Sequence, residues 1–124
     1  MAKPLVVGVD DDLSVRESIA RLATSAGYEP RMFPSAESLL ESGILSGAAC
    51  LVSDVRMPGI GGLELQRRVN AAYPKVPVIL ISAHVDEEVR SRALGEGARE
   101  FFYKPFDGEE LLRAIQRAIE PPNL

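Results

Sequence analysis

The most regular feature of this chain is a set of short apolar runs, each followed at once by a polar residue with reactive chemistry. Unbroken apolar runs of this length are typical of strands that are buried on both faces. The pattern therefore predicts four buried strands. The runs and the residues that follow them are Leu5–Val9 before Asp10 and Asp11, Ala49–Ser53 before Asp54, Val78–Ile81 before Ser82, and Phe101–Tyr103 before Lys104.

Helical patterns lie between these runs. Apolar residues at steps of three and four positions mark one face of each predicted helix. A further strand is predicted over Tyr28–Phe33, and Pro30 within it favours the edge of a sheet. Asp12 or Ser14 can cap the first helix. The predicted helices are Ser14–Ala26, one after Ser35 that contains Ala36, Leu39 and Leu40, then Leu63–Tyr73, Asp86–Glu96, and one from Asp107 or Gly108 to Ile119.

The resulting order, βαβαβαβαβα, predicts an α/β fold, a (βα)5 doubly wound domain with a five-stranded parallel sheet covered by helices on both faces. Because parallel strands end at the same edge of a sheet, the polar residues after the apolar runs should converge there. Ligands bind at this carboxyl edge in open α/β sheets. Three carboxylates, a hydroxyl and an ammonium group are therefore expected in one small pocket.

Asp54 is the strongest candidate for a nucleophile or a metal ligand. A carboxylate can attack phosphorus and form an aspartyl phosphate. By itself, Asp54 reads more readily as an ordinary helix cap at the end of a strand. Asp10 and Asp11 alter that interpretation, because three neighbouring carboxylates repel one another and require a cation. Ligands that are all oxygen suit Mg²⁺ or Mn²⁺.

Size, charge and cysteine content narrow the class of protein. The 124 residues suit one domain, expected at 1–120, with 121–124 as a tail or the start of a linker. A net charge of -4 argues against direct binding to nucleic acid. No apolar segment approaches the roughly 20 residues that cross a membrane, and no secretory signal is recognised. The single Cys50 is expected to be a buried, inert thiol, which fits a reducing cytoplasm.

The motifs in this order resemble the response-regulator receiver domain, the phosphoacceptor module of two-component signalling. Asp54, Phe101 and the Lys-Pro-Phe run are most similar to receivers of nitrogen-fixation and nodulation regulators. The resemblance covers nearly the whole chain and implies the flavodoxin-like fold with strand order 2-1-3-4-5. The matching segments are Val9-Asp10-Asp11, Asp54-Val55-Arg56-Met57-Pro58 with Gly62, Ile81-Ser82-Ala83, and Lys104-Pro105-Phe106.

The resemblance implies a role for each site residue. Asp54 is similar to the phosphorylated aspartate. Asp10 and Asp11 are similar to the acid pair that holds Mg²⁺ (or Mn²⁺) together with Asp54, and Arg56 is expected to add its backbone carbonyl. Lys104 is similar to the lysine that binds the phosphoryl group.

The resemblance also implies a switch and a pocket mouth. Ser82 matches a hydroxyl residue that binds the phosphoryl group and moves on activation, and Phe101 stands at the position of a rotating aromatic residue. Ala83 matches a small residue beside the phosphoryl group. Arg56 and His84 are expected at the pocket mouth, where such residues affect the access of water.

The predicted function is a phosphoacceptor signalling switch rather than an enzyme. Its expected partners are a histidine kinase or phosphotransfer protein, an output protein or domain, and in some cases a second copy of the chain. Phosphorylation is expected to change the face formed by the fourth helix, fifth strand and fifth helix.

Three alternatives use the same residues or fold. A phosphatase with an aspartate nucleophile usually carries a second Asp two positions later, where this chain has Arg56. A flavodoxin-like cofactor carrier needs a first loop that attracts phosphate, and this loop is acidic. A degenerate, docking-only receiver would lack site residues that are present here. Gly59, Gly61 and Gly62 after Asp54 are interpreted as a flexible turn without the Lys-Ser/Thr pair of a P-loop.

Overall fold

The computed structural model describes residues 2–120, and within them the predicted alternation of strands and helices is confirmed. One short 3-10 helix, η1, was not predicted. The predicted tail, 121–124, lies outside the described residues. In chain order the elements are β1 (Leu5–Val9), α1 (Leu13–Ser25), β2 (Glu29–Phe33), α2 (Ala36–Ser42), η1 (Ile44–Gly47), β3 (Cys50–Asp54), α3 (Gly62–Ala72), β4 (Val78–Ser82), α4 (Glu87–Gly95), β5 (Glu100–Tyr103) and α5 (Gly108–Ile119).

The five strands form one parallel sheet in the order β2-β1-β3-β4-β5, which confirms the predicted fold class and strand order. The strand that contains Pro30 is an edge strand, as expected. Val9 pairs with Ser53, and Asp54 pairs with Ile81. This register brings the end of β1 beside the end of β3, so that the acidic residues of the two strands meet at one edge.

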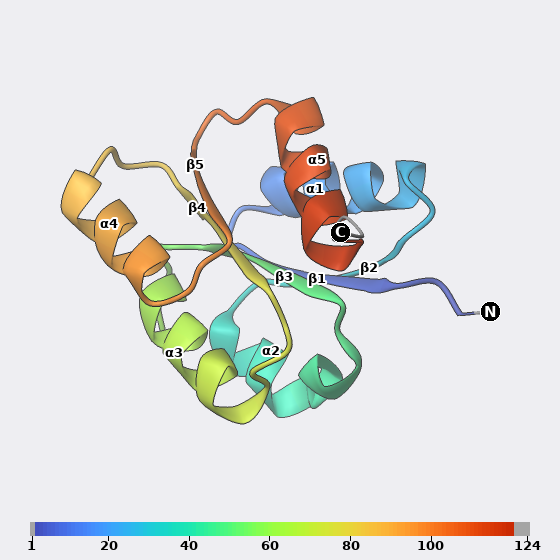
Figure 1. The fold of residues 1–124 in the computed structure, drawn as a ribbon, viewed down its shortest axis with the longest axis horizontal. Helices are drawn as coiled ribbons and strands as arrows, with labels where there is room; N and C mark the ends of the chain where they lie inside the picture. Colours follow the sequence, from blue (N-terminus) through green and yellow to red (C-terminus); the bar gives the residue numbers. More distant parts are fainter. Residues whose placement is uncertain (1, 121–124) are drawn as a thin grey trace.

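Helices cover both faces of the sheet (Figure 1). Alternate residues of each strand enter different cores, since successive side chains point to opposite faces. In β3, for example, Leu51 packs under α2 and α3, whereas Cys50 and Val52 pack under α1 and α5. Cys50 is fully buried, and burial raises the pKa of its thiol to about 12. This confirms the expectation of a buried thiol and leaves the sulfur protonated and inert at neutral pH.

The helices begin at the carboxyl edge of the sheet, and short polar side chains cap four of them. Asp12, rather than Ser14, caps α1 by accepting a hydrogen bond from the Ser14 N–H. Ser35, Asp86 and Asp107 cap α2, α4 and α5 in the same way. Because a cap fixes the direction in which the chain enters a helix, these residues hold the loops that surround the edge.

Helix α4 is attached to its neighbour α3 mainly near its C-terminal end. The buried amide of Gln66 donates to the carbonyl of Ala93, at 3.0 Å. Arg67 pairs in a fork with the carboxylate of Glu96, and Asn70 donates to the carbonyl of the same residue. These contacts fix the end of α4 that lies away from the acidic edge. None of the helices in residues 2–120 is long and apolar enough to cross a membrane.

Candidate functional site

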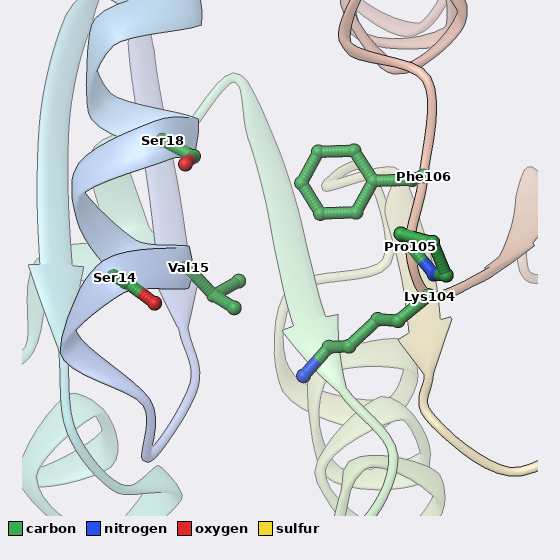
Figure 2. A pocket seen from close by; sticks show the side chains of 6 residues that line it. All are labelled: Ser14, Val15, Ser18, Lys104, Pro105 and Phe106. Carbon is green, nitrogen blue, oxygen red and sulfur yellow. The ribbon is translucent and has the colours of Figure 1, made fainter.

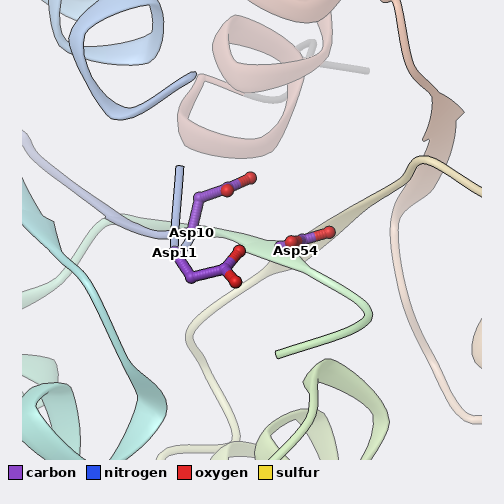
Figure 3. Close-up of side chains that lie close together, drawn as sticks. All are labelled: Asp10, Asp11 and Asp54. Atoms are coloured by element: carbon purple, nitrogen blue, oxygen red, sulfur yellow. The ribbon is translucent and has the colours of Figure 1, made fainter. Parts of the chain in front are cut away.

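Three carboxylates meet at the carboxyl edge of the sheet, as the sequence predicted. Asp10 and Asp11 follow β1, and Asp54 is the last residue of β3. Each offers a ligand oxygen, and these oxygens all lie within 4.8 Å of one another. Figure 3 shows the Asp11 carboxylate pointing toward Asp54 from the neighbouring strand end. Asp10 and Asp54 are buried, whereas Asp11 is exposed. A cation that approaches from solvent would meet Asp11 and then the two buried groups.

Asp10 is held by contacts on both sides of its carboxylate. The Asp12 N–H donates to Oδ1 at 2.9 Å, and the Lys104 ammonium contacts Oδ2 at the same distance. Arg16, on the first helix, donates to the backbone carbonyl of Asp10 at 2.8 Å. Sequence reasoning did not find Arg16, since a polar residue on an amphipathic helix carries no signal of its own. These contacts hold the backbone and the carboxylate of Asp10 in a fixed position at the edge of the site.

Lys104 lies between two acidic residues, which places it in the site as predicted. Its Nζ is 2.9 Å from Asp10 Oδ2 and 3.6 Å from Asp54 Oδ1, and the side chain is only 19% exposed. Burial opposes its charge, but the hydrogen bond to Asp10 and the charges of both carboxylates outweigh that effect and raise the pKa of Lys104. The ammonium therefore remains charged and ready to meet an anionic group.

Asp54 lies in an environment that disfavours its negative charge. The residue is 5% exposed. Burial, and then the neighbouring Asp10, raise the pKa of Asp54 to about 6, although Lys104 acts in the opposite direction. Three carboxylates against one ammonium leave an excess of negative charge, and the donor set contains only oxygen. This arrangement fits a hard divalent cation such as Mg²⁺ or Mn²⁺.

The raised pKa of Asp54 predicts a stability effect that depends on pH. In the unfolded chain the carboxyl ionises near its ordinary value of 3.8, whereas the folded protein holds its proton to about pH 6. The native state is therefore weakened as the pH rises from about 4 to 6, and the loss persists above that range. Without metal, Asp54→Asn should raise the free energy of unfolding by about 3 kcal/mol at pH 8.

Urea unfolding in EDTA tests this prediction. The gain from Asp54→Asn should disappear at about pH 3, where the carboxyl is largely protonated in both states. An equal gain at both pH values would mean that the amide merely packs better than the acid, and that the charge of Asp54 does not strain the fold.

The residues expected at the pocket mouth are found there. Arg56, Ala83 and His84 are exposed and line a hollow above Asp54. The guanidinium of Arg56 lies 3.9 Å from the carboxylate of Asp86, which caps α4. The loop on one side of the pocket is thus linked to the first turn of a helix on the other. The residues that line the hollow are Asp11, Asp12, Asp54, Arg56, Ala83, His84 and Lys104.

The hydroxyl of Ser82 is turned toward its own loop. Ser82 ends β4 and is 2% exposed. Its Oγ donates to the carbonyl of His84 at 3.0 Å and accepts from the N–H of the same residue at 3.1 Å. The residue lies beside Asp54 in the sheet, as predicted, but its hydroxyl is already hydrogen-bonded. A phosphoryl group would have to compete for it.

Phe101 is half-buried on the face of the sheet that packs against α4. Its ring meets that of Tyr103 edge to face, with the ring centres 5.4 Å apart, which confirms the shared face expected from strand alternation. Tyr103 also donates a long hydrogen bond, 3.4 Å, to Glu87 at the start of α4. Phe102 points to the other core. The aromatic pair therefore connects β5 with α4.

A second hollow adjoins the site on the other side of Lys104. As Figure 2 shows, the Lys104 side chain extends from the end of β5 toward Val15 on α1, and the ring of Phe106 lies above it. The Lys104–Pro105 peptide bond is cis. Lys104 thus forms the wall between this mixed polar and apolar hollow and the acidic one. The residues that line it are Ser14, Val15, Ser18, Lys104, Pro105 and Phe106.

The interpretation of Gly62 as part of a flexible turn is wrong. Gly62 is the first residue of α3 and is buried against the end of β3. A Cβ there would overlap the backbone oxygen of Asp54 and lie 2.9 Å from the Cα of Val55. Its N–H donates to the Val55 carbonyl at 2.8 Å. Gly62 is needed for close packing, and it anchors the backbone of the acidic strand end.

Comparison with known proteins agrees with this geometry. Residues 6–116 match the model of the response regulator receiver domain. The chain belongs to this family. Receiver domains of response regulators are signalling domains of two-component systems rather than typical enzymes. The match confirms the predicted family, and the fold described above is the flavodoxin-like receiver fold.

Relatives of this receiver include nodulation protein W and the transcriptional regulatory protein FixJ. It is 40% identical to nodulation protein W of Bradyrhizobium diazoefficiens, over 95% of this chain and 52% of the relative. It is 39% identical to the transcriptional regulatory protein FixJ of Azorhizobium caulinodans, over 90% of this chain and 53% of the relative. The chain therefore spans about half the length of these curated relatives.

Solved receiver structures show the same architecture. The crystal structure of FixJ-N aligns with 100% of this chain and with 99% of the FixJ-N chain, with a TM-score of 0.83 and 34% sequence identity. The structure of the response regulator StyR aligns with 96% of this chain and with 60% of the StyR chain, with a TM-score of 0.86 and 44% sequence identity.

Proposed function

We propose that this receiver accepts a phosphoryl group on Asp54 from a histidine kinase or phosphotransfer protein. The observation that carries the proposal is the convergence of Asp10, Asp11 and Asp54 around the ammonium of Lys104. A carboxylate oxygen of Asp54 forms the new bond to phosphorus, and the bond from phosphorus to the donor nitrogen breaks, with the electron pair leaving on that nitrogen. Asp54 lies at the floor of a hollow that an incoming phosphoryl group can enter.

In this proposal Asp10, Asp11 and Asp54, together with the backbone carbonyl of Arg56, hold Mg²⁺ or Mn²⁺. The acidic cluster fits such an ion, because its donors are all oxygen and its charge exceeds that of Lys104. The ion would offset the negative charge of the phosphoryl group and the carboxylate. Lys104 lies within reach of Asp54 and would bind a phosphoryl oxygen.

Phosphorylation by a small donor tests this function. With acetyl phosphate and Mg²⁺, intact-mass spectrometry should detect one added phosphoryl group, and EDTA should prevent the addition. Phosphorylation at full stoichiometry in EDTA would contradict the role of the metal.

The phosphoryl group is proposed to act as a switch through Ser82 and Phe101. Ser82 would exchange its hydrogen bonds with His84 for one to a phosphoryl oxygen, and Phe101 would turn inward into the space that the loop leaves. The new contacts would shift a pre-existing equilibrium between two states. The face formed by α4, β5 and α5 would then bind the output protein or domain, or a second copy of the chain.

Amide exchange with and without beryllofluoride, a phosphoryl mimic, examines the switch. The amides between His84 and Arg113 should change their protection most, since this segment contains the loop after β4, α4, β5 and the first half of α5. Changes confined to α1 and α2 would contradict the proposal and point to a different output surface.

Arg56 and His84 are proposed to set the lifetime of the phosphorylated state. Ala83 beside them is small and leaves room for the phosphoryl group. Arg56 is always charged and can hold a phosphoryl oxygen while it shields the group from water. Arg56→Ala should shorten the half-life about five-fold, which corresponds to about 1 kcal/mol of protection.

The decay of radiolabelled protein at fixed Mg²⁺ measures this lifetime, and Arg113→Ala on α5 is the control, since it removes an exposed arginine that does not line the pocket. An unchanged or longer half-life in Arg56→Ala would leave only the backbone of Arg56 in the site.

The remaining features of the proposal follow from the family. The receiver would assist its own phosphorylation and dephosphorylation without turning over a substrate, and it would work in the cytoplasm, where histidine kinases present their phosphoryl groups. A phosphatase is disfavoured because Arg56 stands where a second aspartate is needed. A docking-only receiver is disfavoured because the site residues are present and lie together.

A further inference from the structure

The loop between β3 and α3 carries the proposed backbone ligand of Arg56, and its start is tightly fixed. The Val55 N–H donates to the carbonyl of Ile81 at 2.9 Å, and the Val55 carbonyl accepts from the N–H of Gly62 at 2.8 Å. These bonds hold the two ends of the loop. They leave the intervening residues, 56–61, to be positioned by something else.

Glu37 on α2 contacts this loop near its C-terminal end. Its Oε2 accepts a hydrogen bond from the Ile60 N–H at 3.0 Å, across 23 positions of sequence. The preceding residue, Gly59, has a φ of 76°, and a Cβ on it would overlap the same carboxylate. The positive φ favours glycine at this position, and an added Cβ would displace the Glu37 carboxylate.

The neighbouring residues hold both oxygens of the Glu37 carboxylate away from bulk solvent or in a hydrogen bond. Its second oxygen, Oε1, is shielded from solvent and has no hydrogen-bond partner among the described residues. The N–H of Ile60 is the main cause that lowers the pKa of Glu37, so the group stays ionised at neutral pH. Helix α2 is itself fixed by the Ser35 cap and by the fully buried Leu39. A charged acceptor on a fixed helix can thus hold the loop.

We propose that Glu37 is a positioning residue for the metal site, because it holds the loop that presents the Arg56 carbonyl. The inference rests on the proposed function. Between the anchors at Val55 and Ile60 the chain has little freedom, since Pro58 restricts its own backbone and Met57 packs on the core. Release of Ile60 would loosen the segment between the two fixed ends of the loop and let the carbonyl of Arg56 move, while β3 and α3 remain packed.

The experiment compares variants of Glu37 with a matched control on the same helix. Glu37→Ala removes the acceptor, Glu37→Asp shortens it so that it no longer reaches Ile60, and Glu37→Gln keeps an acceptor oxygen. Glu41→Ala removes an exposed glutamate that lies away from the loop. Mg²⁺ affinity is measured by calorimetry on the protein without a phosphodonor, and the Ile60 amide is followed by hydrogen exchange.

Glu37→Ala and Glu37→Asp should weaken Mg²⁺ binding about five-fold, somewhat less than the roughly ten-fold or more that partners in direct contact with a ligand contribute. Exchange of the Ile60 amide should accelerate in both. Glu37→Gln should stay within about two-fold of the unmodified protein, since the neutral amide keeps the hydrogen bond. Glu41→Ala should match the unmodified protein. If Glu37→Ala does not fold, the milder Glu37→Asp carries the test.

Two different results separate this inference from the proposed function. Wild-type Mg²⁺ affinity in Glu37→Asp, with or without faster exchange at Ile60, would overturn the role of Glu37 alone. Absence of Mg²⁺ binding by the unmodified protein, or unchanged binding in Asp11→Ala, would instead overturn the proposed metal site.

Discussion

Asp54→Asn should abolish phosphorylation by acetyl phosphate and by a cognate kinase. Asparagine keeps the shape of the side chain at the end of β3, but it lacks the anionic oxygen that attacks phosphorus. Of the two buried carboxylates in contact with Lys104, Asp54 lines the hollow and Asp10 does not. Intact-mass spectrometry should find no phosphorylated protein above its detection limit.

Asp107→Asn is the matched control. Asp107 caps α5, and asparagine caps a helix about as well as aspartate. This variant should be phosphorylated like the unmodified protein. Wild-type stoichiometry in Asp54→Asn would show that another group accepts the phosphoryl group and would remove the basis of the proposed function.

Gly62→Ala should destabilise the protein by about 3 kcal/mol, since the added methyl group meets backbone rather than a side chain that can turn away. The new Cβ would overlap the carbonyl oxygen of Asp54, so β3 and α3 must separate to make room. The expected result is a large fall in the free energy of unfolding, measured by urea denaturation, and a displaced Asp54 backbone.

Gly95→Ala provides the contrast. Gly95 is the last residue of α4, and a Cβ there would meet nothing within 4 Å. Alanine favours a helix over glycine by up to about 1 kcal/mol, so Gly95→Ala should be neutral or stabilising. A Gly62→Ala protein as stable as Gly95→Ala would mean that the end of β3 yields easily and that the close approach is unimportant.

The sequence was sufficient for the alternation of strands and helices and for the gathering of polar side chains at one edge of the sheet, because both depend on periodicity. The strand order came instead from the resemblance to receiver domains. Buried parallel strands read as unbroken apolar runs, and their ends lie at one edge, so the meeting of Asp10 with Asp54 could be expected. The choice of Asp12 over Ser14 as a cap, by contrast, depends on the local backbone path, which spacing does not determine.

The features that escaped prediction are individual contacts that depend on the path of the folded backbone. Nothing local to Glu37 marks it as a partner of Ile60, and nothing local to Arg16 directs it to the carbonyl of Asp10. Gly62 looks like a turn residue until the helix is seen against the strand. The direction of the Ser82 hydroxyl likewise depends on how the following loop folds back.

The uneven attachment of α4 has a mechanical consequence. Gln66, Arg67 and Asn70 hold the C-terminal end of this helix by hydrogen bonds. Its first turn rests on the core through Val89, and its polar contacts are the exposed pair of Arg56 with Asp86 and a long hydrogen bond from Tyr103. A helix that is held at its C-terminal end can tilt about that end. Over a helix about 13 Å long, a tilt of about 10° moves the free end by about 2 Å. A small shift of the loop beside Asp54 would therefore displace the N-terminal end of α4, while its C-terminal end keeps its position against α3.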